Sequence, residues 1–392
     1  MRAFGLLALI AGFSALVLVP LVKQYSSLLL LSPDWKRLKL NETQHQSILS
    51  SHKFVVVGGP HRGGTTLLWR LLSSHPSVGA FPEHVDSDFA EGSFLQTVLP
   101  TFGVGLETMG GSASSKRMSG LGRYAFSASA HMTEAHDLNT ASSSRRLISE
   151  WGFHWNLSRP VLLEKTPTDM LTSRLLQALL KPAVPSFLFI TRHPLAVSLA
   201  HKRWPCCRQM SVASLVLHWV ASHQWLSVDL PHLRNARIIR YEELALRPQT
   251  YLAVVLSWLQ IPAHDIDVPV SRDTNAKYES LYCRHHIDNS MSAEQHCEMA
   301  LALQPAMDDL GLGYDVLSGG RLGFGCIRKR LRSALVFHNM SNRQTLDSMD
   351  QDIRSRHQSC SGVRPSLAWR KSVESLPSNR DARSISTRLL IK

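Results

Sequence analysis

Residues 53–76 read KFVVVGGPHRGGTTLLWRLLSSHP, and this stretch decides the fold of the chain. The β-branched run at 54–57 is long enough for one buried strand. Glycines then mark a tight loop, and leucines recur at helical spacing from Leu67 onward. A strand, a glycine-rich loop and a helix start bind anions, because glycine lets backbone N–H groups turn inward and the helix N-terminus carries partial positive charge. The stretch therefore predicts an anion-binding loop.

The loop differs from the phosphate loop of ATP-using enzymes at a decisive position. Residues 59–66 read GPHRGGTT, whereas the Walker pattern is GxxxxGK[ST]. Thr65 stands where that pattern has its lysine, and the nearest fixed cation is Arg62 inside the loop. A guanidinium holds a phosphate or sulfate group through two parallel hydrogen bonds. The loop is therefore typical of a site for an anionic donor and departs from ATP chemistry with Mg²⁺.

Residues 60–66 resemble the 5′-phosphosulfate loop of sulfotransferases that use 3′-phosphoadenosine 5′-phosphosulfate (PAPS). The most similar pattern is P-R-S-G-T-T of Golgi protein-tyrosine sulfotransferases and related carbohydrate sulfotransferases. This chain has one extra residue before the arginine and a glycine in place of the serine. The resemblance covers residues 52–316. The loop residues to which it assigns donor binding are Arg62, Gly63, Gly64, Thr65 and Thr66.

The resemblance also implies a catalytic glutamate some twenty residues after the loop arginine, and Glu83 occupies that position. An acceptor hydroxyl is a poor nucleophile until a base takes its proton. A carboxylate within hydrogen-bond reach of that hydroxyl would serve. His84 is the neighbouring alternative, because an imidazole can do the same work. Asp86 and Glu91 are further alternatives.

A second strand, loop and helix start at the segment 161–167, which reads VLLEKTP. Lys165 lies at the end of this predicted strand, where ligands bind in open α/β sheets. It resembles the lysine of the family's K-x-P segment. The resemblance implies that Lys165 neutralises charge on the bridging oxygen as the sulfuryl group leaves. A surface lysine at a strand end is the alternative.

The third apolar run, at 186–191, is followed by Arg192. This segment resembles the family's 3′-phosphate-binding segment, so Arg192 would pair with the 3′-phosphate of PAPS. The family's serine lies eight positions after the arginine, where this chain has Ala200. Ser198 lies six positions after it and would reach the phosphate only if the helix start has shifted.

Residues 236–244 predict a fourth strand, and they contain a Tyr-Glu-x-Leu segment that recurs in the family. The resemblance implies that Tyr241 lines the nucleotide site; packing at the strand end is the alternative. Residues 271–278 resemble the family's late loop over the nucleotide, in which Arg272 and Lys277 would contact phosphate. Helical patterns are predicted at 170–179, 211–230, 248–259 and 294–310.

Residues 3–22 form an apolar stretch without charge, long enough to span a bilayer as a helix. We expect an uncleaved signal anchor, with 1–2 as a cytoplasmic tail and 23–51 as a stem; a cleaved signal peptide is the alternative. The sulfotransferase-like domain follows at 52–316. Three N-glycosylation triplets agree with a luminal domain, as do six cysteines. The predicted glycoprotein is a single-pass type II protein of the Golgi membrane, with glycans at Asn41, Asn156 and Asn339.

The net charge of +13 is concentrated in the last segment, 317–392, which carries 15 of the 43 Lys/Arg but only 5 of the 30 Asp/Glu. This tail shows little periodicity, and we expect it to be largely disordered. Its basic clusters would favour an anionic glycan as acceptor; a solvated tail without a role is the alternative. The chain shows no nucleic-acid-binding motif and no metal-ligand spacing, so neither partner is expected.

Strands that alternate with helices predict an α/β, P-loop-containing nucleotide-binding fold, with a central parallel sheet flanked by helices and an N-terminal transmembrane helix. The resemblance implies a PAPS-dependent sulfotransferase that acts on a hydroxyl of a glycan or a protein tyrosine in the secretory pathway. Glu83 would take the proton, and Arg62 and Lys165 would stabilise the transferring group. Two alternatives stay open: a P-loop kinase-like phosphotransferase, and a non-catalytic nucleotide- or glycan-binding protein of the same fold.

Overall fold

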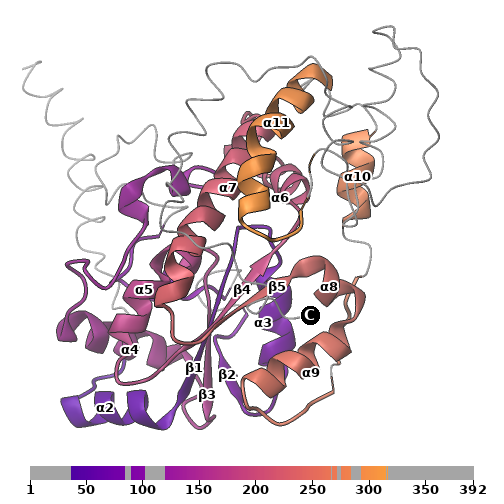
Figure 1. Ribbon diagram of the computed structural model, residues 1–392. Coiled ribbons are helices and arrows are strands. Elements are labelled where there is room, and N and C mark those ends of the chain that lie inside the picture. The colour runs from indigo at the N-terminus through magenta and orange to yellow at the C-terminus, as the bar shows by residue number, and fades with distance from the viewer. Residues whose placement is uncertain are drawn as a thin grey trace, which may run out of the picture.

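The computed structural model describes residues 37–83, 90–101, 120–265, 267–271, 275–283, 293–314 and 316. Its strands form one parallel sheet in the order β2-β3-β1-β4-β5. Helices cover both faces of this sheet (Figure 1), which confirms the predicted α/β class. The strands are β1 (Lys53–Gly58), β2 (Val78–Ala80), β3 (Val161–Lys165), β4 (Ser186–Thr191) and β5 (Ala236–Arg240).

The middle of the sheet is fully buried. All five residues of β3 and all six of β4 are buried. A parallel strand that is covered on both faces reads as a continuous apolar run, which is why these strands are visible in the sequence. The register sets Val57 of β1 beside Lys165 of β3 and Leu188 of β4. The carboxyl ends of the central strands therefore meet at one edge.

The direction of each connection decides which face its helix covers. The connection from β1 to β2 through α3 runs one way across the sheet, and those through α4, α5 and α7 run the other way. Right-handed crossovers therefore put α3 on the opposite face from the other three, as Figure 1 shows. The helices are α2 (Glu42–Ser51), α3 (Thr65–Ser73), α4 (Ala141–His154), α5 (Asp169–Leu179), α6 (Pro194–His201), α7 (Val212–Asp229), α8 (Tyr241–Leu246), α9 (Pro248–Trp258), α10 (Ala276–Cys283) and α11 (Ala293–Asp309).

The fourth predicted strand is shorter than expected. β5 ends at Arg240, so the strand predicted at 236–244 is wrong beyond this residue. Tyr241 begins α8, and Glu242 and Glu243 lie in its first turn. Acidic residues are favourable there because of the helix dipole. The turn puts Tyr241 at the carboxyl edge of the sheet. The short strand β2 was not predicted, because three residues give no pattern.

Helix α2 lies within the range 23–51 that was expected to be a stem. The Asn41 side chain caps this helix by accepting a hydrogen bond from the Gln44 backbone N–H at 2.8 Å, and the Gln44 side chain accepts one from the Asn41 backbone. Ile48 and Leu49 are buried in the main hydrophobic core. This part of the range is therefore packed against the domain.

Within the described ranges, no helix has both the length and the apolar character that a membrane span requires. The predicted anchor at 3–22 lies outside these ranges, as do the tail 317–392 and Asn339. Of the other predicted glycosylation residues, Asn41 and Asn156 are exposed on the surface.

Candidate active site

The glycine-rich loop makes a tight approach to β4 and α8. Gly59 and Gly64 have φ values of 153° and 108°, in the region that favours glycine. A Cβ atom on Gly59 would lie 2.3 Å from the Ile190 carbonyl oxygen, and one on Gly64 would lie 2.3 Å from a ring carbon of Tyr241. Neither position has room for a side chain. The loop therefore brings backbone N–H groups close to whatever binds beside Tyr241.

The loop leads into the N-terminus of α3, which opens on a cavity of about 660 Å³. Gly64 caps the helix without a side-chain hydrogen bond, and the first N–H groups of a helix have no partner within it. These donors and the helix dipole attract an anion. The cavity is lined by His61, Arg62, Gly64, Thr65, Thr66, Leu67, Glu91, Ser93, Phe94, Thr101, Leu121, Pro167, Thr168, Arg192, Ala200, Trp204, Pro205, Tyr241 and Tyr278.

Two arginines on the cavity wall are supported by aromatic rings. The Arg62 guanidinium lies 3.9 Å from the centre of the Trp204 ring and takes part in no ion pair among the described residues. Partial burial lowers its pKa from the ordinary value, although arginine keeps its charge. The Arg192 guanidinium lies 4.1 Å from the Tyr241 ring and 5.2 Å from the Tyr278 ring. Its Nη1 donates to the Arg62 carbonyl oxygen at 3.3 Å. The structure thus brings both predicted arginines together.

A buried ion pair lies at the carboxyl end of β3. Lys165 is fully buried, and its Nζ donates to Oε1 of Glu91 at 3.2 Å. Burial raises the pKa of the Glu91 carboxyl, and Lys165 offsets part of that effect. Burial also lowers the pKa of Lys165, against the opposite influence of Glu91. Glu91 reaches the cavity wall, so the pair combines a cavity-facing carboxylate with a fixed cation behind it.

A second set of buried groups fixes the segment that carries Glu91. The Thr166 hydroxyl donates to Glu164 Oε1 at 2.6 Å and accepts from the Ser93 backbone N–H at 3.0 Å. Burial raises the pKa of the Glu164 carboxyl, and it raises that of the neighbouring Asp169 well above its ordinary value. These contacts join the turn at 92–94 to the end of β3, and so hold Glu91 beside Lys165.

Glu83, the predicted base, does not line the cavity. Its side chain is 36% exposed and pairs with Arg70 on α3, whose Nε donates to it at 3.0 Å. His84 and Asp86 lie outside the described residues. Glu91, one of the alternatives considered from the sequence, is the carboxylate that the fold brings to the cavity. Counting from Arg62 cannot reveal this, because Glu91 is held at the cavity by contacts with Lys165, which is distant in the sequence.

The serine and alanine of α6 differ in where they point. Ser198 is fully buried, is not on the cavity wall, and its Oγ has no partner among the described residues. Ala200 is on the cavity wall. The helix start has therefore not shifted to bring Ser198 to the cavity. Of the late-loop residues, Lys277 has its Nζ 4.9 Å from the Tyr278 ring, and Arg272 lies outside the described residues.

A half-buried histidine, His61, lines the cavity, and two buried histidines, His201 and His218, lie near it; sequence reasoning gave none of them a role in the site. His61, the extra loop residue, packs against the Tyr124 ring at 5.6 Å and the His201 ring at 6.4 Å. The ring centre of His218 also lies 4.4 Å from that of Tyr124. Burial lowers the pKa of His201 to about 4, and those of His61 and His218 well below their ordinary value. All three are neutral at physiological pH. The extra residue before Arg62 was the one sequence signal for this cluster.

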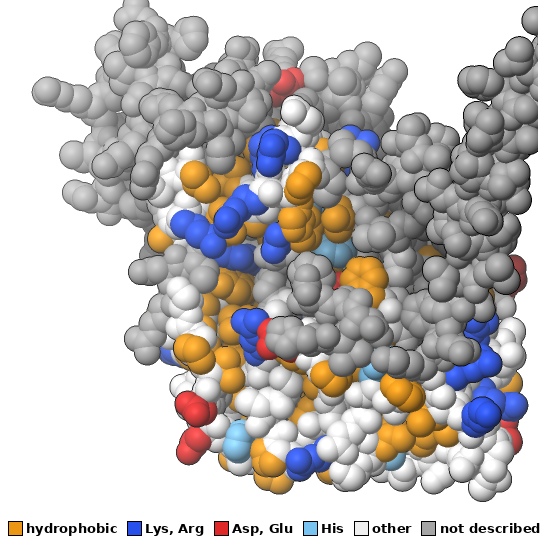
Figure 2. Space-filling model, turned by 180° about the vertical axis from the view of Figure 1, so that it is seen from behind, with side chains coloured by type: hydrophobic (Ala, Val, Ile, Leu, Met, Phe, Trp, Pro, Cys, Tyr) orange, Lys and Arg blue, Asp and Glu red, His pale blue; other side chains and the backbone are white. Residues whose placement is uncertain are grey.

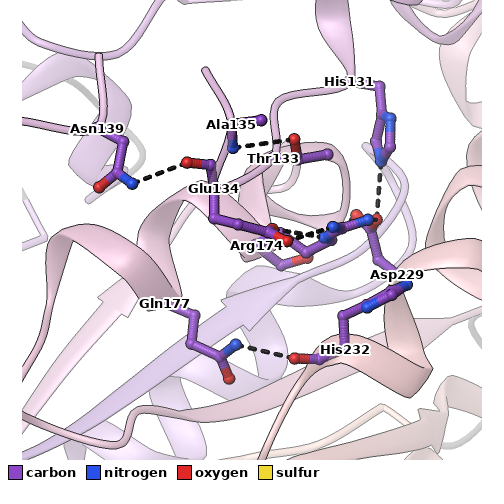
Figure 3. A network of polar contacts seen from close by, with 10 residues as sticks. His131, Thr133, Glu134, Ala135, Asn139, Arg174, Gln177, Asp229 and His232 are labelled. Carbon is purple, nitrogen blue, oxygen red and sulfur yellow. Dashed lines mark hydrogen bonds and ion pairs between the residues drawn. The ribbon is translucent and has the colours of Figure 1, made fainter. Parts of the chain in front are cut away.

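A separate polar network joins the loop at 131–139 to α5 and α7 (Figure 3). His131 donates from Nε2 to Asp229 Oδ1 at 2.8 Å, and Arg174 donates from Nε to Glu134 Oε2 at 2.7 Å. None of these residues lines the cavity. The network therefore holds the loop on the helices and takes no part in the site.

The model of the "Sulfotransferase family" matches residues 55–265, which is more than half of the chain. No curated protein matches. A solved sulfotransferase domain from the curacin biosynthetic pathway is similar at 18% identity and a TM-score of 0.33, covering 54% of this chain and 75% of that one. The sulfotransferase domain of the Synechococcus PCC 7002 olefin synthase is similar at 16% identity and a TM-score of 0.31, covering 64% and 97%. By its match to the family model, the chain belongs to the sulfotransferase family.

Proposed function

We propose that this sulfotransferase takes the sulfuryl group from PAPS and transfers it to an acceptor hydroxyl. The observation that carries the proposal is the convergence of Arg62 and Arg192 on one cavity at the N-terminus of α3. PAPS has anionic groups at both its 5′ and 3′ positions, and the cavity has a cation for each. When bound, PAPS supplies the activated sulfuryl group.

The donor residues fit this ligand at both ends. The loop at 59–66 and the helix start would hold the 5′-phosphosulfate through backbone N–H groups and Arg62. Arg192 would hold the 3′-phosphate, and the rings of Tyr241 and Tyr278 lie close to its guanidinium and support it. The lack of room at Gly64 holds the loop against Tyr241, which lines the same cavity.

Glu91 is our proposed base in place of Glu83. It lines the cavity, and its raised pKa makes proton transfer from a hydroxyl easier than at an ordinary carboxylate. As the acceptor oxygen bonds to sulfur, Glu91 takes its proton, and the bond from sulfur to the phosphate oxygen breaks. The electron pair leaves with that oxygen, where Arg62 and Lys165 stabilise the charge.

His61 is a weaker base than Glu91, although it also lines the cavity. Burial lowers its pKa, and the nearby charges of Lys165 and Arg62 lower it further. Protonation would create a third positive charge beside these two. Protonation of Glu91 instead removes the negative charge that pairs with Lys165, so the positive charge of Lys165 behind the wall then favours the departing oxygen.

The acceptor is proposed to be a glycan or a protein tyrosine in the secretory pathway. The apolar segment 3–22 and the exposed positions Asn41 and Asn156 support that compartment. On the face opposite to that of Figure 1, lysine and arginine side chains lie next to hydrophobic ones (Figure 2). Such a surface suits an acidic acceptor chain.

Calorimetric titration with 3′,5′-adenosine bisphosphate, adenosine 5′-phosphate and ATP tests the donor site. We expect the bisphosphate to bind most tightly, without Mg²⁺, and Arg192→Ala to remove this preference. Binding of ATP that needs Mg²⁺ would instead favour the kinase-like alternative. Tight bisphosphate binding without sulfuryl transfer from labelled PAPS to any tyrosine peptide or glycan would favour a non-catalytic binding protein.

A further inference from the structure

A chain of hydrogen bonds reaches Arg192 from the far end of the domain. The Tyr314 hydroxyl donates to Glu242 Oε2 at 2.9 Å, and Asn275 Nδ2 donates to Glu242 Oε1 at 2.9 Å. The Nε of Arg192 donates to Asn275 Oδ1 at 2.7 Å. Arg192 directly follows β4, and Asn275 directly precedes α10. Glu242 lies in α8, and Tyr314 follows α11. The network therefore ties four separate parts of the chain to one guanidinium.

The carboxylate fixes the direction of every bond in this chain. An ionised glutamate only accepts hydrogen bonds, and Oε1 of Glu242 also accepts from the backbone N–H of His193 at 2.9 Å. The amide of Asn275 must therefore turn its NH₂ group to Glu242 and its oxygen to Arg192. This orientation follows from the chemistry of the partners, which is the sound basis for assigning an amide.

The amide separates the carboxylate from the guanidinium. A direct Glu–Arg pair would set opposite charges against each other and compete with any anionic ligand. Here the carboxylate polarises the amide, and the amide holds Arg192 through a neutral oxygen. The rings of Tyr241 and Tyr278 restrict the guanidinium further. Asn275 and the two rings thus hold Arg192 in place without a direct contact between its guanidinium and the Glu242 carboxylate.

We infer that Asn275 and Glu242 are positioning residues that orient Arg192 for a 3′-phosphate; this role rests on the proposed function. It has particular weight in this chain because the position of the family's serine is Ala200, which offers no hydroxyl. Recognition of the 3′-phosphate then depends on how firmly Arg192 is held. Preorganising a binding group raises affinity by reducing the ordering that binding requires.

The test measures the ratio of affinities for 3′,5′-adenosine bisphosphate and adenosine 5′-phosphate. Because the two nucleotides differ only in the 3′-phosphate, this ratio gives the contribution of that phosphate to binding. We expect Asn275→Ala to lower the affinity for the bisphosphate about tenfold and to leave the affinity for adenosine 5′-phosphate unchanged. Asn275→Asp would place a carboxylate on Arg192, and the ratio should fall at least as far. Tyr314→Phe should lower the ratio by a smaller factor.

Tyr251→Phe is the matched control. The Tyr251 hydroxyl donates to Glu243 at 3.2 Å, so it has the same chemistry as Tyr314 but acts on the neighbouring glutamate. Its ratio should equal that of the wild type, and thermal melting of each variant checks the fold. Equal weakening of both nucleotides by Asn275→Ala, a wild-type ratio in Asn275→Asp, or equal effects of the two Phe variants would overturn the positioning role. A wild type without 3′-phosphate preference would instead overturn the proposed function itself.

Discussion

The donor side of the cavity and its base side are built in different ways. The donor side comes from a continuous strand, loop and helix, with Arg62 in the loop and Arg192 directly after the next central strand. The base side pairs Glu91 with Lys165, residues that are 74 positions apart. Glu91, which supplies the carboxylate, directly precedes the short 3-10 helix Gly92–Phe94. Anion binding is thus encoded locally, whereas the base is set by tertiary packing.

The largest effect on the base side is expected when each of the two candidate bases, Glu91 and Glu83, is replaced in turn. We expect Glu91→Gln to lower kcat about 10²- to 10⁴-fold, because Glu91 is the only carboxylate that the described part of the chain places on the cavity wall. Affinity for 3′,5′-adenosine bisphosphate should be unchanged. Glu83→Gln is the control, since that residue pairs with Arg70 at the surface, and its kcat should match the wild type. A large loss of kcat in Glu83→Gln with normal rates in Glu91→Gln would restore Glu83 as the base.

The pH dependence of kcat sharpens the account of the base side. The pKa of Glu91 is raised above its ordinary value, so activity should fall as pH drops through a point above 4.5, where the carboxylate gains a proton. Lys165 lowers this pKa. Lys165→Met should therefore move the acidic limb to higher pH, besides lowering the rate. A limb that stays in place would show that Glu91 is not the titrating group.

A substitution on the proposed donor side should also be able to raise nucleotide affinity. Ala200 lies on the cavity wall at the position of the family's serine. We expect Ala200→Ser to raise affinity for the bisphosphate by about two- to tenfold, as one added hydrogen bond would. Affinity for adenosine 5′-phosphate should not change. Ser198→Ala is the control, because this buried side chain does not reach the cavity. A gain for both nucleotides in Ala200→Ser would argue against a 3′-phosphate beside this helix.

The smallest effect concerns the network of Figure 3, which belongs to neither side. Hydrogen bonds from Arg174 lower the pKa of Glu134 to about 2. A depressed carboxyl pKa stabilises the fold above the unfolded value of about 4.3, and this stability is lost as pH falls towards 2. Since Glu134 is largely exposed, the contribution is below about 1 kcal/mol. The Tm difference between wild type and Glu134→Gln should shrink from pH 6 to pH 3, with nucleotide binding unaffected.

The same contrast explains what could be predicted from the sequence. The sheet was predicted because β1, β3 and β4 are continuous apolar runs, and Arg62, Lys165 and Arg192 were placed at strand ends where a parallel sheet gathers its ligands. Glu83 was chosen by counting residues from Arg62, but this count says nothing of which side chain the fold turns to the cavity. Tyr241 was predicted as a site residue from a motif, but the helix α8 that begins at Tyr241 was not predicted. Asn275 carried no signal, because its role depends on a glutamate and an arginine that are distant in the chain.

The hydrogen bond from Tyr314 to Glu242 has a consequence for how the protein is made. Tyr314 lies at the end of the described domain, where Gln304 donates to its carbonyl oxygen at 3.1 Å and Arg240 holds the preceding Leu312 at 3.0 Å. Synthesis proceeds from the N-terminus, so the glycine loop and both arginines leave the ribosome well before this tyrosine. A nascent chain therefore has the loop and both arginines proposed to bind the donor before it has Tyr314, the last group of the hydrogen-bond chain that leads to Arg192. Maturation of the donor site is coupled to completion of the domain, and stalled chains that end on either side of residue 314 should differ in how well they retain the nucleotide.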